Sequence, residues 1–396
     1  MTFDVVIVGG GPVGACAGAL LAHGSLRVCI LEPKRPPTPT GSLDSRVVAI
    51  SRASERILNS AGAWTRMSGP RIEAYERMRI WHESTSPAGA LVFDAAEVGE
   101  ANLGYIIENR LLQTALLDEF TSAGGHLQAA DFQQLLVGAD SVTVETSDGT
   151  LTAKLVIGAD GAKSAVRESV GLTASEFDFN ETAIVATVAT ERPHEKTAWQ
   201  RFMRNGTLAL LPLADGTSSI VWSADNNLAA ELMAMPASDF DIELTRASDL
   251  ALGPTRLVSD RATFPLKRMG AHRYVTQRCA LIGDAAHVVH PLAGQGVNLG
   301  LLDAATIAQL VLDARAERED PGALRVLRPY ERWRKTEVTV MSTAIDAFDR
   351  FLAHGSGPVS KLAQRGLGWV NRSQEIKRLF VNRALGVAGE LPRAAR

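Results

Sequence analysis

The sequence predicts an α/β protein in which an antiparallel sheet is inserted into a domain built on a parallel sheet, with a helical region at the C-terminus. Short apolar runs alternate with a helical pattern at the start of the chain, as buried parallel strands and crossover helices do. The middle of the chain reads mostly as strands with hairpin turns. We expect a discontinuous first domain (1–75, 100–180 and 270–340), an inserted sheet (76–99 and 181–269) and a helical end (341–396).

The composition is that of a folded globular protein, with 46% hydrophobic and 21% charged residues among 396. The net charge of −3 provides no basic field, so no nucleic-acid partner is expected. Cys16, Cys29 and Cys279 form no C-x-x-C pair, which predicts neither a disulfide framework nor a metal site. By inspection, no apolar stretch reaches the roughly 18 residues that span a bilayer. These features favour a cytoplasmic location and leave open a contact with the surface of the inner membrane.

The first element is a strand over 3–8, followed by the turn Gly9-Gly10-Gly11-Pro12-Val13-Gly14 and a helix over 13–22. In the spacing G-x-G-x-x-G the first glycine permits a tight turn, the second lets a pyrophosphate approach and the third lets the helix pack closely. The helix N-terminus offers N–H groups and partial positive charge to phosphates. A second strand (27–31) ends at Glu32, which can accept hydrogen bonds from a ribose. The segment predicts a bound dinucleotide.

A second motif lies far along the chain, where Gly283-Asp284-Ala285-Ala286-His287 follows a buried strand. The loop Pro291–Asn298 then leads into a helix from about residue 297 to 315. A carboxylate here can bind the polyol that links a flavin ring to its phosphates, and NAD has no such free polyol. The N-terminus of the helix would stabilise negative charge on a reduced flavin. The two motifs together therefore predict FAD.

Three motifs carry a resemblance to a known family. Gly9–Gly14, Asp160-Gly161 and Gly283-Asp284 match the three fingerprints of the class A FAD-dependent aromatic hydroxylases, the group that includes para-hydroxybenzoate hydroxylase. The segments 44–51, 109–113 and 290–300 are similar to the ubiquinone-biosynthesis branch of that group. The resemblance implies a Rossmann-like FAD-binding domain with an inserted substrate sheet.

The resemblance also implies roles for individual residues. Arg46 and Arg110 would lie at the flavin, Asp160 would serve FAD and NAD(P)H, and Asp284 would bind the ribitol. The full set of predicted cofactor-binding residues is Gly9, Gly11, Pro12, Gly14, Glu32, Arg46, Arg110, Asp160, Asp284, Pro291, Gly294, Gly296, Val297 and Asn298. From the residues alone, the two arginines are simply candidate anion partners, and Asp160-Gly161 could equally be a turn after a strand.

The sequence contains a single glycine-rich dinucleotide turn, so NAD(P)H is expected as a transient co-substrate. By resemblance, it reduces the flavin, O2 then forms a flavin hydroperoxide, and a phenol ring takes up the distal oxygen. We predict hydroxylation of a polyprenylated phenol in ubiquinone biosynthesis. Alternatives are an FAD monooxygenase of a small soluble aromatic compound and a non-catalytic FAD-binding member of a biosynthetic complex. A flavin-dependent halogenase is disfavoured because no W-x-W-x-I-P stretch occurs.

Candidates for the substrate side are fewer. His290 is the only candidate for a catalytic group, whereas His287 reads as structural. The inserted sheet offers Phe202, Leu213, Trp222 and Phe264, although aromatic residues in strands usually belong to the core.

The C-terminal segment 351–396 carries eight Lys and Arg against two Glu, a net charge of +6. Within it Ile376, Leu379 and Phe380 share one helical face. A basic amphipathic helix of this kind can lie on an anionic membrane, and it can equally be a packed helix with a solvated charged face. A complex with other ubiquinone-biosynthesis proteins is a further expectation.

Overall fold

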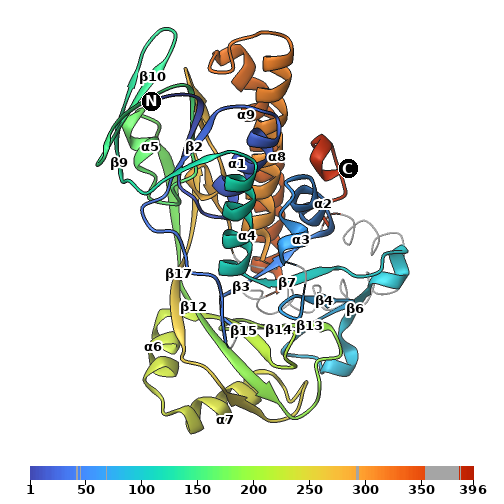
Figure 1. Cartoon of the computed structure of the whole chain (residues 1–396). Coiled ribbons are helices and arrows are strands. Elements are labelled where there is room, and N and C mark those ends of the chain that lie inside the picture. Colours follow the sequence, from blue (N-terminus) through green and yellow to red (C-terminus); the bar gives the residue numbers. More distant parts are fainter. Residues whose placement is uncertain (42, 45, 68, 291–293, 353–382, 384) are drawn as a thin grey trace.

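A parallel sheet organises the upper half of the molecule in Figure 1, a computed structural model that describes residues 1–396 except 42, 45, 68, 291–293, 353–382 and 384. The strand order is β18-β19-β11-β1-β2-β8, in which β18 is antiparallel and the rest are parallel. β9 and β10 extend antiparallel from β11. The bounds are β1 (Thr2–Val8), β2 (Val28–Leu31), β8 (His126–Gln128), β9 (Phe132–Val137), β10 (Val142–Thr146), β11 (Gly149–Gly158), β18 (Val275–Thr276) and β19 (Cys279–Leu281).

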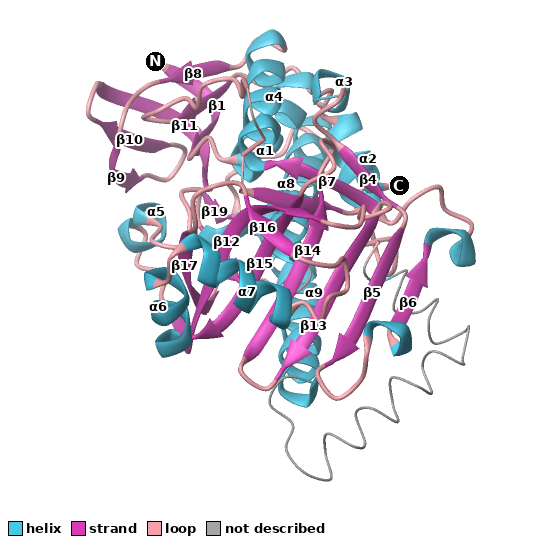
Figure 2. Cartoon of the chain, turned by 90° about the horizontal axis from the view of Figure 1, so that it is seen from below, coloured by secondary structure: helices cyan, strands magenta, loops and turns pink. Residues whose placement is uncertain are grey.

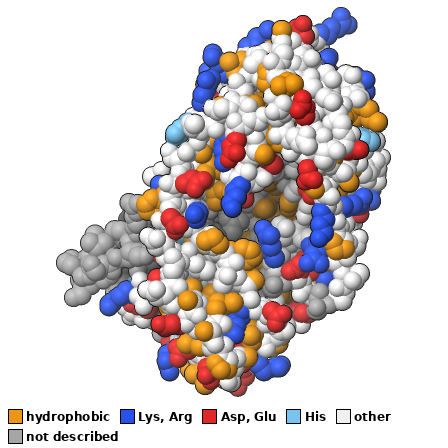
Figure 3. Space-filling view, turned by 90° about the vertical axis from the view of Figure 1, so that its left-hand side faces the viewer, with side chains coloured by type: hydrophobic (Ala, Val, Ile, Leu, Met, Phe, Trp, Pro, Cys, Tyr) orange, Lys and Arg blue, Asp and Glu red, His pale blue; other side chains and the backbone are white. Residues whose placement is uncertain are grey.

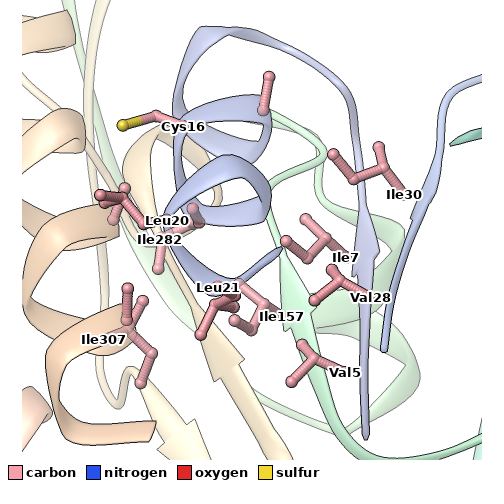
Figure 4. Close-up of a cluster of buried hydrophobic side chains, with 14 of the residues drawn as sticks. Val5, Ile7, Cys16, Leu20, Leu21, Val28, Ile30, Ile157, Ile282 and Ile307 are labelled. Atoms are coloured by element: carbon pink, nitrogen blue, oxygen red, sulfur yellow. The ribbon is translucent and has the colours of Figure 1, made fainter. Parts of the chain in front are cut away.

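Helices pack on this sheet because its strands are apolar on both faces. α1 (Pro12–His23) contacts α4 (Asn109–Ser122) and α8 (Gln295–Ala316), and α9 (Leu324–Leu352) packs on α8. Figure 4 shows the resulting core, where Leu21 of α1 and Ile307 of α8 meet Ile7 and Ile157 of the strands. Each such side chain contributes about 1.5–3 kcal/mol when fully buried. All three cysteines lie free in the interior.

α8 corrects one expectation from the sequence. Its most apolar 18-residue window has a mean hydropathy of 1.3, so the helix is long and apolar enough to cross a membrane, although no such stretch was expected. Polar residues such as Asn298 and Asp303 interrupt the apolar run, but the mean hydropathy of the helix stays high enough for a membrane span. Of its most apolar window 67% is buried inside the protein, so α8 is a core helix.

An antiparallel sheet forms the lower half, and its order is β20-β17-β12-β15-β14-β13-β5-β6, with β16 on β12. β12 and β17 are long and run from the upper half into this sheet (Figure 1). The predicted hairpin over 207–224 is confirmed as β14 and β15. The bounds are β5 (Arg77–His82), β6 (Leu91–Asp94), β12 (Ala174–Thr190), β13 (Thr197–Met203), β14 (Gly206–Pro212), β15 (Ser218–Asp225), β16 (Thr255–Leu257), β17 (Ala262–Ala271) and β20 (His287–Val288).

The mostly strand-like reading of this middle stretch was wrong over two helices, α6 (Asn226–Ala234) and α7 (Ala237–Ala247). Asp225 caps α6 by accepting hydrogen bonds from the N–H groups of Asn227 and Leu228. Both helices cover the sheet face that is turned away from the upper half (Figures 1 and 2).

A small third sheet joins the two halves, in the order β3-β7-β4. Its strands are β3 (Val47–Ile50), β4 (Glu73–Tyr75) and β7 (Gly104–Glu108). The remaining short elements are α2 (Arg52–Ser60), α3 (Trp64–Met67), α5 (Ala165–Ser169), η1 (Pro87–Gly89), η2 (Ala95–Val98), η3 (Gly283–Ala285) and η5 (Arg393–Ala395).

The last described residues return to the upper half. Ser60 of α2 donates to the carbonyl of Ala394 at 3.1 Å, and the N–H of Arg393 donates to Gln309 of α8 at 2.8 Å. The segment with Ile376, Leu379 and Phe380 lies outside the described residues. The observed architecture confirms the predicted fold class, with a parallel sheet, an antiparallel sheet and C-terminal helices.

Candidate flavin-binding site

Four loops meet at one edge of the parallel sheet. β19, β11, β1 and β2 are neighbours that run in the same direction, so their carboxyl ends lie side by side. Gly283-Asp284, Asp160-Gly161, the glycine turn and Glu32 follow these four strands in turn. Ligands of open α/β sheets bind outside such an edge.

The glycines of the first turn differ in what surrounds them. Gly9 has a φ of +104°, and a Cβ on it would lie 2.3 Å from the carbonyl oxygen of Ala159. A Cβ on Gly14 would lie 2.1 Å from the carbonyl oxygen of Gly9. These two glycines let the first two fingerprints pack closely. A Cβ on Gly11 would meet no atom within 4 Å, so the space at the N-terminus of α1 is open, as a diphosphate requires.

Two side chains fix the same turn, one just after β2 and one from α4. The N–H of Gly10 donates to Oε2 of Glu32 at 2.8 Å, and Gln113 donates from Nε2 to the carbonyl of Gly10 at 2.9 Å. Each Glu32 oxygen has a second lone pair, which a ribose hydroxyl can use. Pro12 is the first residue of α1, where its missing N–H costs nothing. Sequence reasoning did not assign Gln113 a role.

The carboxylate of Asp160 organises its own loop. It accepts from Oγ of Ser164 at 2.5 Å and from the N–H of Val166 at 3.0 Å, which orients the start of α5. Its predicted service to FAD and NAD(P)H stays a prediction.

Two contacts bring the third fingerprint against the first two. Arg167, which is buried, donates to the carbonyls of Ala285 and Ala162, both at 2.9 Å. The side chain of Val13 packs against two glycines. A Cβ placed on Gly283 would lie 3.1 Å from Cγ1 of Val13, and a Cβ placed on Gly300 would lie 2.5 Å from Cγ2 of Val13. Arg167 was not found from the sequence, because nothing local marks a surface-type residue as buried.

Asp284 is exposed at this edge, and no other described residue hydrogen-bonds its side chain. Burial by surrounding protein atoms raises the pKa of Asp284 above its ordinary value, while the positive charge of His287 and Arg46 opposes the rise and Asp303 adds to it. A carboxylate that is enclosed by protein but still accessible is suited to accept polyol hydroxyls. Arg46 lies close enough to influence Asp284, and its guanidinium lies 5.6 Å from the ring centre of Phe264.

Asp44 positions the two predicted arginines. Its Oδ2 pairs with Arg110 at 2.9 Å, and its Oδ1 accepts from the N–H of Arg46 at 3.0 Å. The N–H of Asp44 donates in turn to the buried Glu108, which Arg71 binds with two 2.7 Å hydrogen bonds. The arginines are therefore held at the site by a chain of carboxylates that sequence reasoning missed.

The N-terminus of α8 also faces open space. Gly294 caps the helix with a φ of +62°, and a Cβ on Gly296 would meet no atom within 4 Å. Asn298 is buried and ties this end to β3 and α2, since it donates to the carbonyl of Ala49 and accepts from the N–H of Ser51, both at 2.9 Å. Val297 is partly buried, and Pro291 lies outside the described residues.

The two histidines of this region are both buried. His287 donates from Nε2 to Asp303 at 2.6 Å, which agrees with its structural reading. His290 lies 3.7 Å from Oε2 of Glu181 and packs edge-to-face on Phe179, with ring centres 4.7 Å apart. A catalytic role for His290 stays a prediction.

Strand register sorts the substrate candidates by face. Phe202, Thr207, Ser223, Ala183 and Phe264 are paired in a row across the sheet, on the face away from α6 and α7.

Trp222 belongs to the neighbouring row and points to the opposite face. It packs near Phe240 of α7, with ring centres 6.1 Å apart. Leu213 is buried just after β14, where its carbonyl is 3.1 Å from Nε2 of His194. Of the four candidates, Phe202 and Phe264 are thus the two on the row that the helices leave uncovered.

The residues present fit FAD. Two helix N-termini beside open space can take a diphosphate and a planar ring, and Glu32 and Asp284 can accept ribose and polyol hydroxyls. Figure 3 shows a hollow between the upper and lower halves, with Lys, Arg and hydrophobic side chains around it.

Comparison with known proteins agrees with this geometry. A family described as "FAD binding domain" matches residues 2–337. The chain is 37% identical to ubiquinone hydroxylase UbiL of Rhodospirillum rubrum, over 97% of this chain and 89% of the relative. It is 32% identical to 3-demethoxyubiquinol 3-hydroxylase of Escherichia coli, over 97% of this chain and 98% of the relative. The crystal structure of p-nitrophenol 4-monooxygenase PnpA from Pseudomonas putida has the same fold, with a TM-score of 0.76. The two chains are 19% identical, over 97% of this chain and 98% of PnpA. This chain belongs to the FAD-binding monooxygenase family, as a homologue of the ubiquinone hydroxylases.

Proposed function

We propose that this protein hydroxylates the aromatic ring of a polyprenylated phenol in ubiquinone biosynthesis, as an FAD-dependent monooxygenase that uses NAD(P)H and O2. The observation that carries the proposal is the convergence of three flavin fingerprints, from residues 9, 160 and 283 onward, at one sheet edge. Near full-length identity to ubiquinone hydroxylases supports the choice of substrate class.

The residues divide the work of holding the cofactor, which when bound supplies the activated oxygen. The Gly9–Gly14 turn and Glu32 would hold the adenosine diphosphate end. Asp284 would accept the polyol hydroxyls, and the first N–H groups of α8 would stabilise negative charge on the bound ring. Arg46, between Asp284 and Phe264, adds a positive charge where the flavin half and the sheet meet.

The antiparallel sheet supplies the substrate side of this proposal. Thr207, Ser223 and Ala183 are small, and in their row they lie between the rings of Phe202 and Phe264. Small side chains flanked by aromatic ones suit a flat ring, which a protein must hold against the flavin with water excluded.

The substrate class also bears on location and partners. A polyprenyl chain resides in the bilayer, so we propose a cytoplasmic protein that acts at the surface of the inner membrane. The net charge of +6 over residues 351–396 supports an anionic lipid contact. Association with other proteins of the same pathway belongs to this proposal.

The test is complementation of bacterial strains that each lack one ring hydroxylase of ubiquinone biosynthesis, with the quinone intermediates identified by mass. Restoration of ubiquinone in one strain supports the proposal and names the ring position. In parallel, the purified yellow protein is mixed with NADH or NADPH and candidate phenols, and bleaching of the flavin is followed. A protein that restores no strain and is bleached faster by a small soluble phenol would overturn the proposed substrate. One that no reductant bleaches would overturn the enzymatic proposal.

A further inference from the structure

A buried cluster of charges lies directly beneath the Gly283-Asp284 turn. Its centre is Asp303 in the middle of α8, which is completely buried. Arg334 of α9 is 2% exposed and His287 is 3% exposed. Charged groups are rarely buried this fully unless they are paired, so the cluster needs an explanation.

Asp303 accepts three hydrogen bonds from three different segments. Oδ1 accepts from Nε of Arg334 at 2.7 Å, and Oδ2 accepts from Nε2 of His287 at 2.6 Å and from the N–H of Gly283 at 3.0 Å. Burial opposes the charge, but His287 and Arg334 together hold the pKa of Asp303 below its ordinary value. The carboxylate is therefore ionised, and His287 carries a hydrogen on Nε2.

The same turn of α9 is tied to the strand that leads into the flavin loop. Tyr330 donates to the carbonyl of Leu281 in β19 at 2.7 Å. Glu331 accepts from the N–H groups of Tyr274 and Val275, at 2.6 and 3.1 Å. Displacement of α9 would therefore pull on β19 and on Asp303, and through Asp303 on Gly283.

We infer that Asp303 is a positioning residue that couples FAD binding to the docking of α9, by fixing the Gly283-Asp284 turn to both helices. The inference rests on the flavin part of the proposed function and not on the identity of the aromatic substrate. His287 extends the coupling to the site itself, since it follows Asp284 by three residues and is bound to Asp303. Because coupling between two sites is reciprocal, FAD tightens the docking of α9 as much as docked α9 tightens FAD.

A second ion pair provides a control, formed by a buried arginine and an aspartate whose side chain is 38% exposed. Arg278 is 2% exposed and binds Asp320 at 2.6 Å, and it also donates to the carbonyls of Ala139 and Lys154. This pair links β19 to the loop before α9, at the end of β19 away from the flavin turn. Asp320→Asn removes an Arg–Asp ion pair, in which the carboxylate is partly exposed, without touching the turn.

The experiment compares the wild type with Asp303→Asn, Arg334→Lys and Asp320→Asn. For each protein, FAD is removed and the Kd is measured as FAD is added back to the apoprotein. The midpoint of urea denaturation of the apoprotein is measured separately. Amide hydrogen exchange of α9 is compared with and without FAD. We expect Asp303→Asn to weaken FAD by roughly 5- to 150-fold, the usual range of coupling between sites, and to abolish the added protection of α9 by FAD. Arg334→Lys keeps the positive charge, so it should lose less FAD affinity and less protection of α9 than Asp303→Asn does. Asp320→Asn should lower the urea midpoint and leave the Kd unchanged.

Two results would overturn the inference. One is a folded Asp303→Asn protein with the wild-type Kd and wild-type protection of α9. The other is an equal loss of FAD affinity in Asp303→Asn and Asp320→Asn, which would mean that lost stability alone explains it. If Asp303→Asn does not fold, Arg334→Lys and His287→Gln carry the same comparison. None of these readouts needs turnover, so a wrong aromatic substrate would leave them intact.

Discussion

Gly11 and Gly14 lie three positions apart in the same turn, yet only Gly14 is enclosed by its own protein. A methyl group on Gly14 would overlap the backbone of Gly9, whereas one on Gly11 would project into the space proposed for the diphosphate. We therefore expect Gly11→Ala to leave the urea midpoint of the apoprotein unchanged and to lower FAD affinity strongly. Gly14→Ala should lower both. If purified Gly11→Ala keeps its yellow colour, and so its FAD, the diphosphate does not bind at this position.

Asp284 provides a prediction with a pH dependence. In the proposed function its ionised carboxylate accepts polyol hydroxyls, and burial raises the pKa of this carboxyl above its ordinary value. FAD affinity should therefore be full above this pKa and should fall as the pH drops through it, beginning at a higher pH than for an ordinary aspartate. Asp284→Asn should bind FAD weakly, with no pH dependence in that window. Full FAD occupancy in Asp284→Asn, measured by the ratio of flavin to protein absorbance, would refute the assignment.

At the residue scale, the sequence revealed groups whose chemistry is local and missed those whose role depends on burial. Gly9, Gly14 and Glu32 stand out because their spacing alone carries meaning. Asp303, Arg334, Arg167 and Glu108 are ordinary charged residues in sequence, and only the folded chain shows that they are buried. Periodicity could have flagged Asp303, since it lies among apolar residues that face the core.

At the scale of elements, the start of α8 depends on one amide. Asn298→Ala would leave the N–H of Ser51 and the carbonyl of Ala49 without partners, at a cost of about 1–3 kcal/mol for a buried polar group. We expect a loss of this size in urea denaturation and weaker FAD binding, because the N-terminus of α8 loses its link to β3. The control is Thr306→Val in the same helix, whose hydroxyl donates to the carbonyl of Leu302 within that helix. Equal effects of both variants would contradict the special role of Asn298.

Elements with a plain signal in the sequence were predicted well, and those with mixed signals were not. β1 follows from a short apolar run, α1 from its place after the glycine turn, and the hairpin of β14 and β15 from its turn residues. α6 and α7 were missed inside a stretch of strands, because short helices that cover one sheet face carry few periodic residues. The sequence also could not show which face of the sheet a side chain occupies. Trp222 faces α7 because its strand pairs it with Ile184 and Leu208, and its aromatic character does not reveal this.

For the whole molecule, the proposed membrane contact can be tested by charge removal. Lys377→Gln combined with Arg378→Gln should weaken binding to anionic vesicles, by about 1 kcal/mol for each charge near the surface. Arg204→Gln with Arg246→Gln, at exposed sites in the turn after β13 and on α7, removes the same charge elsewhere. Equal sedimentation of both proteins with vesicles would count against the contact. Deletion of the C-terminal segment is less informative, since η5 packs on α2 and α8.

The convergence of fingerprints from residues 9, 160 and 283 onward has a consequence for how the protein is made. On the side of β11 away from β1, β10 pairs with residues 149–153, but residues 156–158 have no partner until β19 has been synthesised, and Asp303 and Arg334 are translated later still. The site therefore has a high contact order, and its assembly is expected to be slow. A nascent chain can gain no stabilisation from FAD before its last quarter emerges, and until then it exposes an apolar strand edge that can pair wrongly. Supply of FAD would thus help the protein only at the final stage of folding, when the cofactor selects chains that have closed correctly.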